Sequence, residues 1–156
     1  MANEMTELKI DMGLIAHYGN ADYIDGDMVV LDGIDKVLQV DGTFKFDMIM
    51  MVYCTKGRIQ FETNSNAYTA KAGDVIICLP NSTWENVMVS PDYDSKSVGV
   101  SSKAAQASVQ VNRDYLTLLG YVSHNPVIHL NEERQQMFLK YYAIIAHKIK
   151  NPHGFY

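Results

Sequence analysis

Cysteine is scarce in this sequence of 156 residues, in which Cys54 and Cys78 are the only two. Both lie in apolar runs, without a CxxC pair or the spacing of a zinc site, which predicts two buried, reduced thiols in a cytoplasmic protein. No stretch approaches the roughly 18 apolar residues that a membrane span needs. The acidic start of the chain also lacks the basic and then apolar plan of a secretion signal. No membrane partner is therefore expected.

Basic residues are not in excess either. The 13 Lys and Arg stand against 18 Asp and Glu, which gives a formal net charge of −5. A domain that binds duplex DNA through its phosphates usually carries a basic excess or patch, so these residues are not expected to contact nucleic acid. A glycine-rich phosphate loop is also missing. The remaining composition, 47% apolar and 20% charged, is typical of one soluble globular domain.

Turn signals divide the first hundred residues into short segments. Asp-Gly pairs at residues 25–26, 32–33 and 41–42 are typical of tight hairpin turns, because Asp tolerates positive φ and Gly has no Cβ. Between the turns lie runs rich in β-branched, aromatic and Met residues, which we expect to be strands: Met28–Leu31, Lys36–Val40, Thr43–Thr55, Arg58–Glu62, Ala67–Ala70, Val75–Leu79, Trp84–Val89 and Lys96–Val100. About eight short strands predict an antiparallel sandwich or barrel.

The pattern changes after residue 102. Helical spacing of apolar residues predicts helices over 104–111 and 113–122, and a short extended piece follows at 127–130. Asn131 before two glutamates is typical of a helix N-cap, and the helix that it starts is expected to stop at Asn151. One apolar stripe runs along this helix: Met137, Phe138, Tyr141, Ile144, Ile145 and Ile149.

These patterns predict a mainly β fold with three parts. An N-terminal arm is expected over residues 1–24, a barrel over 25–102, and a helical region over 103–156.

The segment from Gly73 to Trp84 is the most informative part of the sequence. A Gly-Asp turn leads into a buried strand, and a Pro-Asn turn leads out of it into the next strand. This order resembles the second motif of the cupin barrels, G-x5-P-x-G-x2-H-x3-N. Aligned on Gly73, the later motif positions are occupied by Leu79, Asn81, Trp84 and Met88.

The first cupin motif, H-x-H-x3,4-E-x6-G, can be anchored on Gly57. Phe44 and Phe46 then take the places of the two histidines, and Met50 takes that of the glutamate. Metal-binding cupins need imidazole nitrogens and a carboxylate that converge inside the barrel. Since Trp84 replaces the remaining histidine, the resemblance implies a cupin-like double-stranded β-helix, or jelly-roll, barrel without a metal, and we expect no cofactor.

Strand alternation groups the candidate ligand-binding residues on two faces. An aromatic pocket with a few polar groups can hold a small molecule, with a sugar or an indole-like ring stacking on Trp84. The alternative is that the same side chains only fill the barrel core. One face carries Phe44, Phe46, Met48 and Met50, and the face opposite carries Trp84, Asn86 and Met88.

Several stretches together resemble the amino-terminal sensor half of AraC-type transcription regulators: residues 52–58, 73–81 and 90–93, followed by helices. In that family the barrel binds an effector, the following helices dimerise, and a separate carboxy-terminal pair of helix-turn-helix units binds DNA. The resemblance thus implies a small-molecule effector, a homodimer, and DNA as a partner only through units that these 156 residues lack. It fits either the sensor part of a longer regulator or a stand-alone sensor.

The six-residue stripe of the last helix is the expected dimer interface, because monomers seldom expose so wide an apolar patch. The alternative is that the stripe packs back onto the barrel wall. Two other functions stay open, namely a small metal-free cupin enzyme acting on sugars and a cupin used only for assembly. Glu62 and Glu85 are possible paired carboxylates for the enzyme, but no histidine lies near them in sequence. We therefore expect no catalytic residues and no enzyme.

Overall fold

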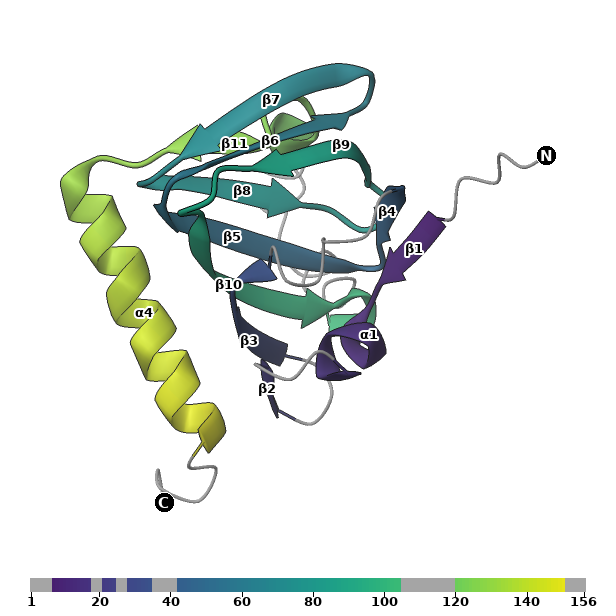
Figure 1. Ribbon diagram of the computed structural model, residues 1–156. Coiled ribbons are helices and arrows are strands. Elements are labelled where there is room, and N and C mark those ends of the chain that lie inside the picture. Colours follow the sequence, from purple (N-terminus) through teal and green to yellow (C-terminus); the bar gives the residue numbers. More distant parts are fainter. Residues whose placement is uncertain (1–6, 18–20, 25–27, 35–41, 105–119, 151–156) are drawn as a thin grey trace.

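The computed structural model describes residues 7–17, 21–24, 28–34, 42–104 and 120–150 (Figure 1). Its strands form two sheets that face each other, with helix α1 (Met12–His17) at one end and the long helix α4 (Glu132–Lys150) outside. The five-stranded first sheet has the order β1 (Glu7–Ile10), β4 (Thr43–Phe46), β9 (Thr83–Val89), β6 (Arg58–Thr63), β7 (Asn66–Lys71). The six-stranded second sheet has the order β11 (Val127–His129), β8 (Asp74–Cys78), β5 (Met48–Lys56), β10 (Asp94–Ser101), β3 (Met28–Asp32), β2 (Ala21–Ile24).

The strand order is that of a jelly roll. Along the chain, β3 to β10 pass between the sheets so that β4, β9, β6 and β7 are neighbours in one and β8, β5, β10 and β3 in the other. All pairings among these eight strands are antiparallel, as two interlocked Greek keys require. The predicted mainly β, cupin-like jelly-roll barrel followed by a C-terminal helix is therefore confirmed.

Asp47 separates two strands where the sequence predicted one over Thr43–Thr55. At this point the chain leaves the first sheet and enters the second, since β4 pairs with β9 and β5 pairs with β8 and β10. The backbone N–H of Asp47 donates to the Ile10 carbonyl, 2.9 Å away. Its carboxylate lies 3.3 Å from Lys9 Nζ and accepts a hydrogen bond from the Ser102 hydroxyl at 3.2 Å. These polar partners of Asp47 hold the crossing between the sheets.

Strands near the start of the chain and after residue 120 pair with strands of the barrel. β1 pairs with β4 and β2 pairs with β3, so the described part of the expected arm over 1–24 belongs to the two sheets. Similarly, β11 adds a strand to the second sheet from within the expected helical region. Strand β11 coincides with the short extended piece predicted over 127–130, whereas β1 and β2 carry too few residues for alternation to reveal them. The predicted strand at Lys36–Val40 and most of the two helices predicted over 104–122 lie outside the described residues.

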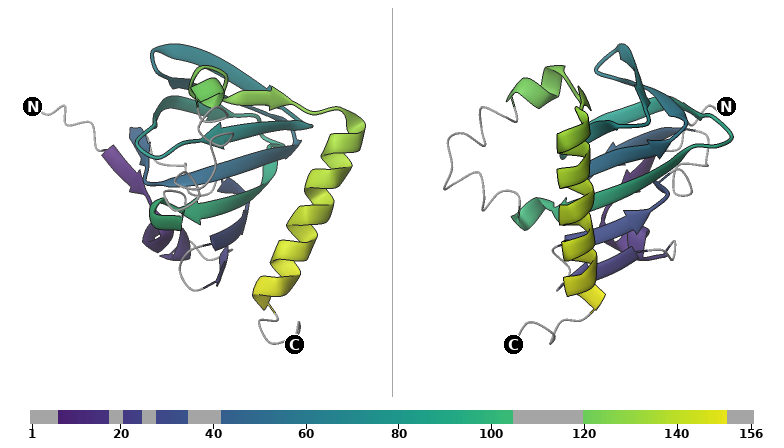
Figure 2. Two further views of the ribbon diagram at one scale, coloured as in Figure 1. Left: turned by 180° about the vertical axis from the view of Figure 1, so that it is seen from behind. Right: turned by 90° about the vertical axis from the view of Figure 1, so that its left-hand side faces the viewer.

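Helix α4 covers the outer face of the second sheet, as the right-hand view of Figure 2 shows. The Asn131 side chain accepts a hydrogen bond from the Arg134 backbone N–H at 2.8 Å, which confirms the predicted N-cap. Further along, the Tyr142 hydroxyl donates to Asp32 Oδ1 at 2.9 Å. The side chains of Val30, Val98 and Tyr142 are buried in this interface, with Met51, Phe138, Ile145 and Ala146 packed against them.

The covering helix explains why β5 is buried on both faces. Its inward residues fill the barrel, and its outward Tyr53 ring lies 5.1 Å from the ring of Phe138. The Tyr53 hydroxyl also donates to Gln135 Oε1 at 3.3 Å. By contrast, β6 alternates buried and exposed residues at Arg58–Phe61, because one face of its sheet meets solvent. Among the described helices, none is both long and apolar enough to cross a membrane.

Gly99 on β10 provides a test of the packing between the sheets. A Cβ at this position would contact Met48 Cε and lie 2.9 Å from Val29 Cγ1, and both of those side chains are fully buried. Because overpacking a core costs about 1–3 kcal/mol, we expect Gly99→Ala to lower the urea midpoint measured by circular dichroism. The control is Gly120→Ala, where a Cβ meets nothing within 4 Å. An unchanged midpoint for Gly99→Ala would contradict the packing described.

Candidate functional site

The four positions that correspond to cupin metal ligands lie in the barrel core. Phe44, Phe46, Met50 and Trp84 are each at most 2% exposed, and none supplies an imidazole or a carboxylate. Among the described residues, no three His, Cys, Asp or Glu side chains lie close enough together to hold a metal ion. The chemistry of these positions fits packing and does not fit a metal.

The barrel interior brings together five of the seven predicted ligand-binding residues. Alternation continues across the crossing at Asp47, so that Phe44, Phe46, Met48 and Met50 all point inward although they come from two sheets. Trp84 lies beside Phe44 on the neighbouring strand of the same sheet, where the two residues are paired. The sequence placed Trp84 on the face opposite, which is wrong for this pair. The ligand-binding role of these five residues stays a prediction.

Trp84 belongs to an aromatic cluster that closes one end of the core. The Phe61 ring stacks on its indole with centroids 4.2 Å apart and planes 20° apart, and the Phe46 ring meets it in a T-shaped contact at 5.1 Å. Such contacts stabilise beyond simple burial by about 0.5–1.5 kcal/mol each. One face of the indole is thus already occupied by Phe61.

Asn86 and Met88 do not lie beside Trp84, which corrects the sequence prediction. Asn86 has a φ of 51°, and the pairing of β9 with β6 shifts register near it. This irregularity breaks the alternation, so that Val87 packs against the core while Met88 is 60% exposed on the outer face. The Asn86 amide instead donates to Glu62 Oε2 at 2.7 Å, also on the outer face.

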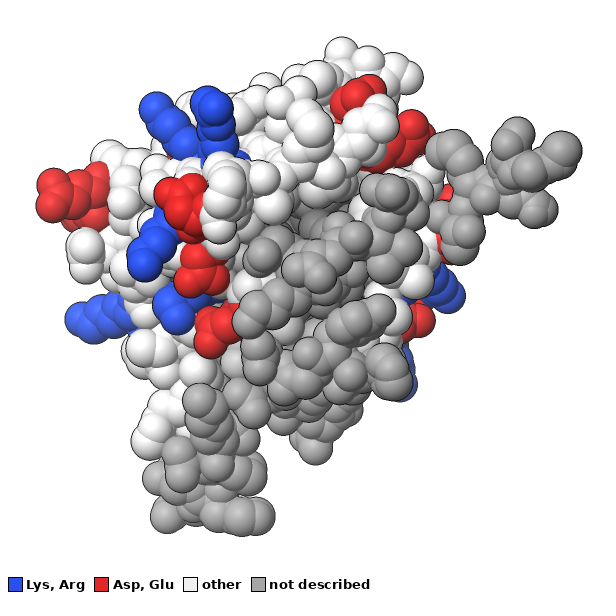
Figure 3. Space-filling model, viewed as in Figure 1, with Lys and Arg blue, Asp and Glu red and all other residues white. Residues whose placement is uncertain are grey.

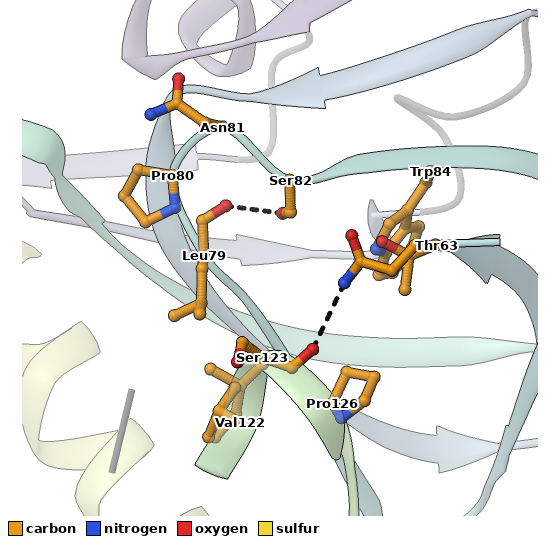
Figure 4. A pocket seen from close by; sticks show the side chains of 11 residues that line it. Thr63, Leu79, Pro80, Asn81, Ser82, Trp84, Val122, Ser123 and Pro126 are labelled. Carbon is orange, nitrogen blue, oxygen red and sulfur yellow. Dashed lines mark hydrogen bonds between the residues drawn. The ribbon is translucent and has the colours of Figure 1, made fainter. Parts of the chain in front are cut away.

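A pocket of about 220 Å³ lies at the end of the barrel next to Trp84 (Figure 4). Two turns of the barrel and one later segment form its walls. Figure 4 shows Thr63 and Trp84 together on one side, Leu79 and Pro80 on another, and Val122, Ser123 and Pro126 closing the third. The described residues that line it are Thr63, Asn64, Ile77, Leu79, Pro80, Asn81, Ser82, Trp84, Val122, Ser123 and Pro126.

Two backbone turns with positive φ shape this pocket. Asn64 and Ser65 have φ values of 52° and 65°, the pattern of a type I′ hairpin turn between β6 and β7. This turn presents the Asn64 amide to the Ser123 carbonyl, to which it donates at 3.3 Å. After β8, Asn81 has a φ of 71°, and the Ser82 hydroxyl donates to the Leu79 carbonyl at 2.6 Å. The Pro-Asn turn that the sequence singled out is therefore one wall of the pocket.

The later wall links the pocket to α4. Val122 and Ser123 lie in a helical segment over 120–124, and Pro126 lies between that segment and strand β11. The Pro126 carbonyl accepts a hydrogen bond from the Ile77 backbone N–H at 2.9 Å, which fixes this segment to β8. Sequence reasoning missed this wall and also Thr63, because side chains from residues about 60 apart meet here only through the sheet topology.

The apolar stripe of α4 divides between two faces. Phe138 and Ile145 pack on the barrel, as the alternative interpretation of the stripe had it, so they are not available to a partner. Met137, Tyr141 and Ile144 are 49%, 59% and 50% exposed. The side chain of Ile149 lies outside the described residues. Three of the six predicted interface residues therefore form an exposed apolar face at helical spacing.

The residues considered for catalysis do not form a site. Glu62 and Glu85 are paired across β6 and β9 but lie on the outer face, away from the pocket. The buried carboxylate of Asp74 is 2.7 Å from His129 Nδ1, and its other oxygen accepts the Lys71 N–H. This pair lies at the turn that starts β8, apart from the pocket lining. Basic and acidic side chains are mixed on the coloured part of the face in Figure 3, without a broad basic area there.

No family model matches the sequence, and no curated protein matches it. Among solved structures, similar chains include the cupin domain of Schizosaccharomyces pombe Cnp3, at 8% identity and a TM-score of 0.41, covering 58% of this chain and 67% of that one. ToxT from Vibrio cholerae has 9% identity and a TM-score of 0.44, covering 74% and 47%. A putative ethanolamine utilization protein EutQ from Salmonella typhimurium has 13% identity and a TM-score of 0.36, covering 51% and 65%. The matched parts thus span half to two thirds of those chains.

The buried thiols give this part of the barrel a pH dependence. Burial raises the pKa of Cys54 from 9.0 to about 11, although the Tyr93 hydroxyl at 3.6 Å lowers it, and burial raises that of Cys78 as well. The folded state therefore holds the Cys54 proton more tightly than the unfolded state. The contribution of the protonated Cys54 thiol to the stability of the fold is fully present below pH 9.0. It is lost as the pH rises through about 11.

We expect the urea midpoint of the protein to fall between pH 9 and 11, and the fall to be smaller in Cys54→Ala, which lacks that thiol. At neutral pH both thiols should resist a disulfide reagent until urea unfolds the chain, since the thiolate is the reactive form. Parallel pH profiles for the two proteins would contradict the raised pKa of Cys54.

Proposed function

We propose that this chain is the effector-sensing and dimerising domain of an AraC-type transcription regulator of the cytoplasm. A small molecule binds next to Trp84 in a barrel without a metal, and DNA is contacted by a separate domain. The pocket whose walls come from both the barrel and the segment before α4 carries the proposal. A ligand in this pocket contacts the barrel, which recognises it, and also the segment that leads to α4, the helix proposed to dimerise.

The connection from pocket to helix is short and hydrogen-bonded. Pro126 forms the pocket wall, and strand β11 follows at once and pairs with β8. Gln135 in the first turns of α4 then donates to the Leu130 carbonyl at 2.8 Å and accepts from Tyr53. A shift of the pocket wall therefore has a continuous path of packed and bonded groups to α4, and such a path supports coupling between ligand and interface.

The exposed face of α4 is the proposed dimer contact. Met137, Tyr141 and Ile144 follow one another at spacings of four and three residues, which places them on one face of the helix. Beside them a groove of about 720 Å³ runs between α4 and the second sheet, lined in part by Met51, Val75 and Ile128. A two-fold contact would bury the same face on both copies, so each apolar residue contributes twice.

A cupin used only for assembly is the second candidate. The dense filling of the barrel interior, where all eighteen core residues are buried, favours it. The pocket at the barrel end favours sensing instead, and the two are separated by whether any small molecule stabilises the folded protein. An enzyme acting on sugars has less support, because the described residues of the pocket lining include no carboxylate and no imidazole.

Ligand sensing predicts stabilisation by a metabolite. A ligand that binds the folded state alone, at a hundred times its Kd, raises stability by about 2.7 kcal/mol. We expect at least one member of a metabolite panel to raise the melting temperature of the wild type but not of Leu79→Trp, whose larger side chain fills the pocket. The matched control, Met88→Trp, adds the same side chain on the outer face and should respond like the wild type. Equal responses of both variants would contradict binding at this pocket.

Dimerisation through α4 predicts a second outcome. Tyr141→Asp puts a charge in the proposed contact while leaving the barrel side of the helix intact, so we expect a monomer in sedimentation velocity with unchanged circular dichroism. Met88→Asp, at an equally exposed position on the first sheet, should leave the dimer intact. A wild type that sediments as a monomer at tens of micromolar would refute the dimer.

A further inference from the structure

We infer that the pocket beside Trp84 takes a small, uncharged ring compound with one hydrogen-bonding group that meets the Thr63 hydroxyl. The inference rests on the proposed function, because it names the chemical class of the ligand for the same pocket. It follows from three properties of the pocket, which are its unpartnered polar group, its size and apolar walls, and its lack of charge.

Thr63 is the polar group that points to a ligand. Its side chain is 6% exposed, and its Oγ1 has no hydrogen-bond partner among the described residues. Leaving a buried hydroxyl unpaired costs about 1–3 kcal/mol, so such groups are rare in folded proteins. Thr63 is also part of the pocket lining, and a ligand there can supply the missing partner.

Three other polar side chains of the walls, those of Asn64, Ser82 and Ser123, are already hydrogen-bonded. The Asn64 amide donates to the Ser123 carbonyl, and the Ser82 hydroxyl donates to the Leu79 carbonyl. The Ser123 hydroxyl donates to the Gly120 carbonyl at 2.8 Å. A ligand with many hydroxyls, such as a sugar, would leave several of them unpaired, which costs free energy for each. The walls therefore favour a ligand with one polar group.

Size and apolar surface favour a ring. Trp84, Ile77, Leu79, Val122 and Pro126 supply most of the apolar wall. An apolar cavity of about 150 Å³ in another protein holds benzene, so the 220 Å³ here accommodates one ring with a short substituent. Apolar walls around a few placed polar groups are the usual form of such sites.

The described part of the lining carries no charge. None of its eleven residues is Asp, Glu, Lys, Arg or His. An ion that enters such a site loses its hydration without gaining a counter-charge, which is strongly unfavourable. The ligand is accordingly neutral at physiological pH.

The test uses matched probes on the whole chain. Benzyl alcohol has the ring and one hydroxyl, ethylbenzene has the same shape without the hydroxyl, benzoate adds a charge, and glucose adds hydroxyls. Binding is followed by the fluorescence of Trp84, the sole tryptophan, and by amide chemical shifts around the pocket. We expect benzyl alcohol to bind roughly three- to tenfold more tightly than ethylbenzene, the range of one neutral hydrogen bond. Benzoate and glucose are expected to bind more weakly than either.

Thr63→Val supplies the decisive variant, because valine has the shape of threonine without the hydroxyl. Benzyl alcohol should then bind no more tightly than ethylbenzene, whereas Thr63→Ser should keep the preference. Thr69→Val on the exposed part of β7 is the control. Removing an unpartnered hydroxyl should not lower the melting temperature, so a loss of binding cannot be assigned to unfolding.

Tighter binding of benzoate or glucose, or an unchanged preference in Thr63→Val, would overturn the inference. If a charged metabolite stabilises the wild type and Leu79→Trp abolishes this, the ligand class is wrong while the proposed function stands. If the neutral probes bind through Thr63 but no metabolite stabilises the protein, the proposed function fails while the ligand class is supported.

Discussion

Close packing of the two inner sheet faces is the constraint on which the rest of the molecule depends. Protein interiors fill at the density of organic crystals, and here the rings of Phe46, Phe61 and Trp84 pack together inside the barrel. The described core residues fill the interior, and the pocket of about 220 Å³ lies at the end of the barrel. The pocket lies where the aromatic cluster stops and the turns after β6 and β8 begin.

The second constraint is the outer face of the second sheet. A sheet with apolar residues on both faces must be covered twice, and α4 covers the outer one through Phe138, Tyr142 and Ile145. A helix used in this way presents its opposite side to solvent. The apolar residues on that opposite side do not belong to the cluster that packs α4 on the barrel, so substitutions there leave that packing intact.

Much of the barrel could be predicted from the sequence because its signals are local. Turn residues, alternation and the Asn131 cap each act within a few residues. Seven of the eight predicted strands lie in the described residues, and the structure has strands at all seven. Of the two failures, one has a distant cause and the other a local cause. Asp47 ends a strand through partners distant in sequence, and the positive φ of Asn86 reverses the alternation that placed Met88 inward.

The pocket itself was only partly predictable. The Pro-Asn turn and Trp84 stood out from the motif, but Thr63 looked like any strand threonine, and Val122 like any helical valine. What joins them is the jelly-roll path, which brings the ends of β6 and β8 together with a segment some 45 residues further on. No pattern within one segment carries that information.

The pocket wall is shared by the barrel and the segment before α4, and this limits how far a ligand could shift the position of that segment. A ligand moves an equilibrium between two conformations only by the ratio of its affinities for them, however tightly it binds. Contacts with Trp84 and Thr63, which are buried in the barrel, would add affinity for both conformations alike. Only contacts with Val122, Ser123 and Pro126 can discriminate between positions of that segment. Contacts with the later wall would thus set how far a ligand shifts the conformational equilibrium, and contacts with the barrel would set its affinity. Substitutions could change the two properties independently.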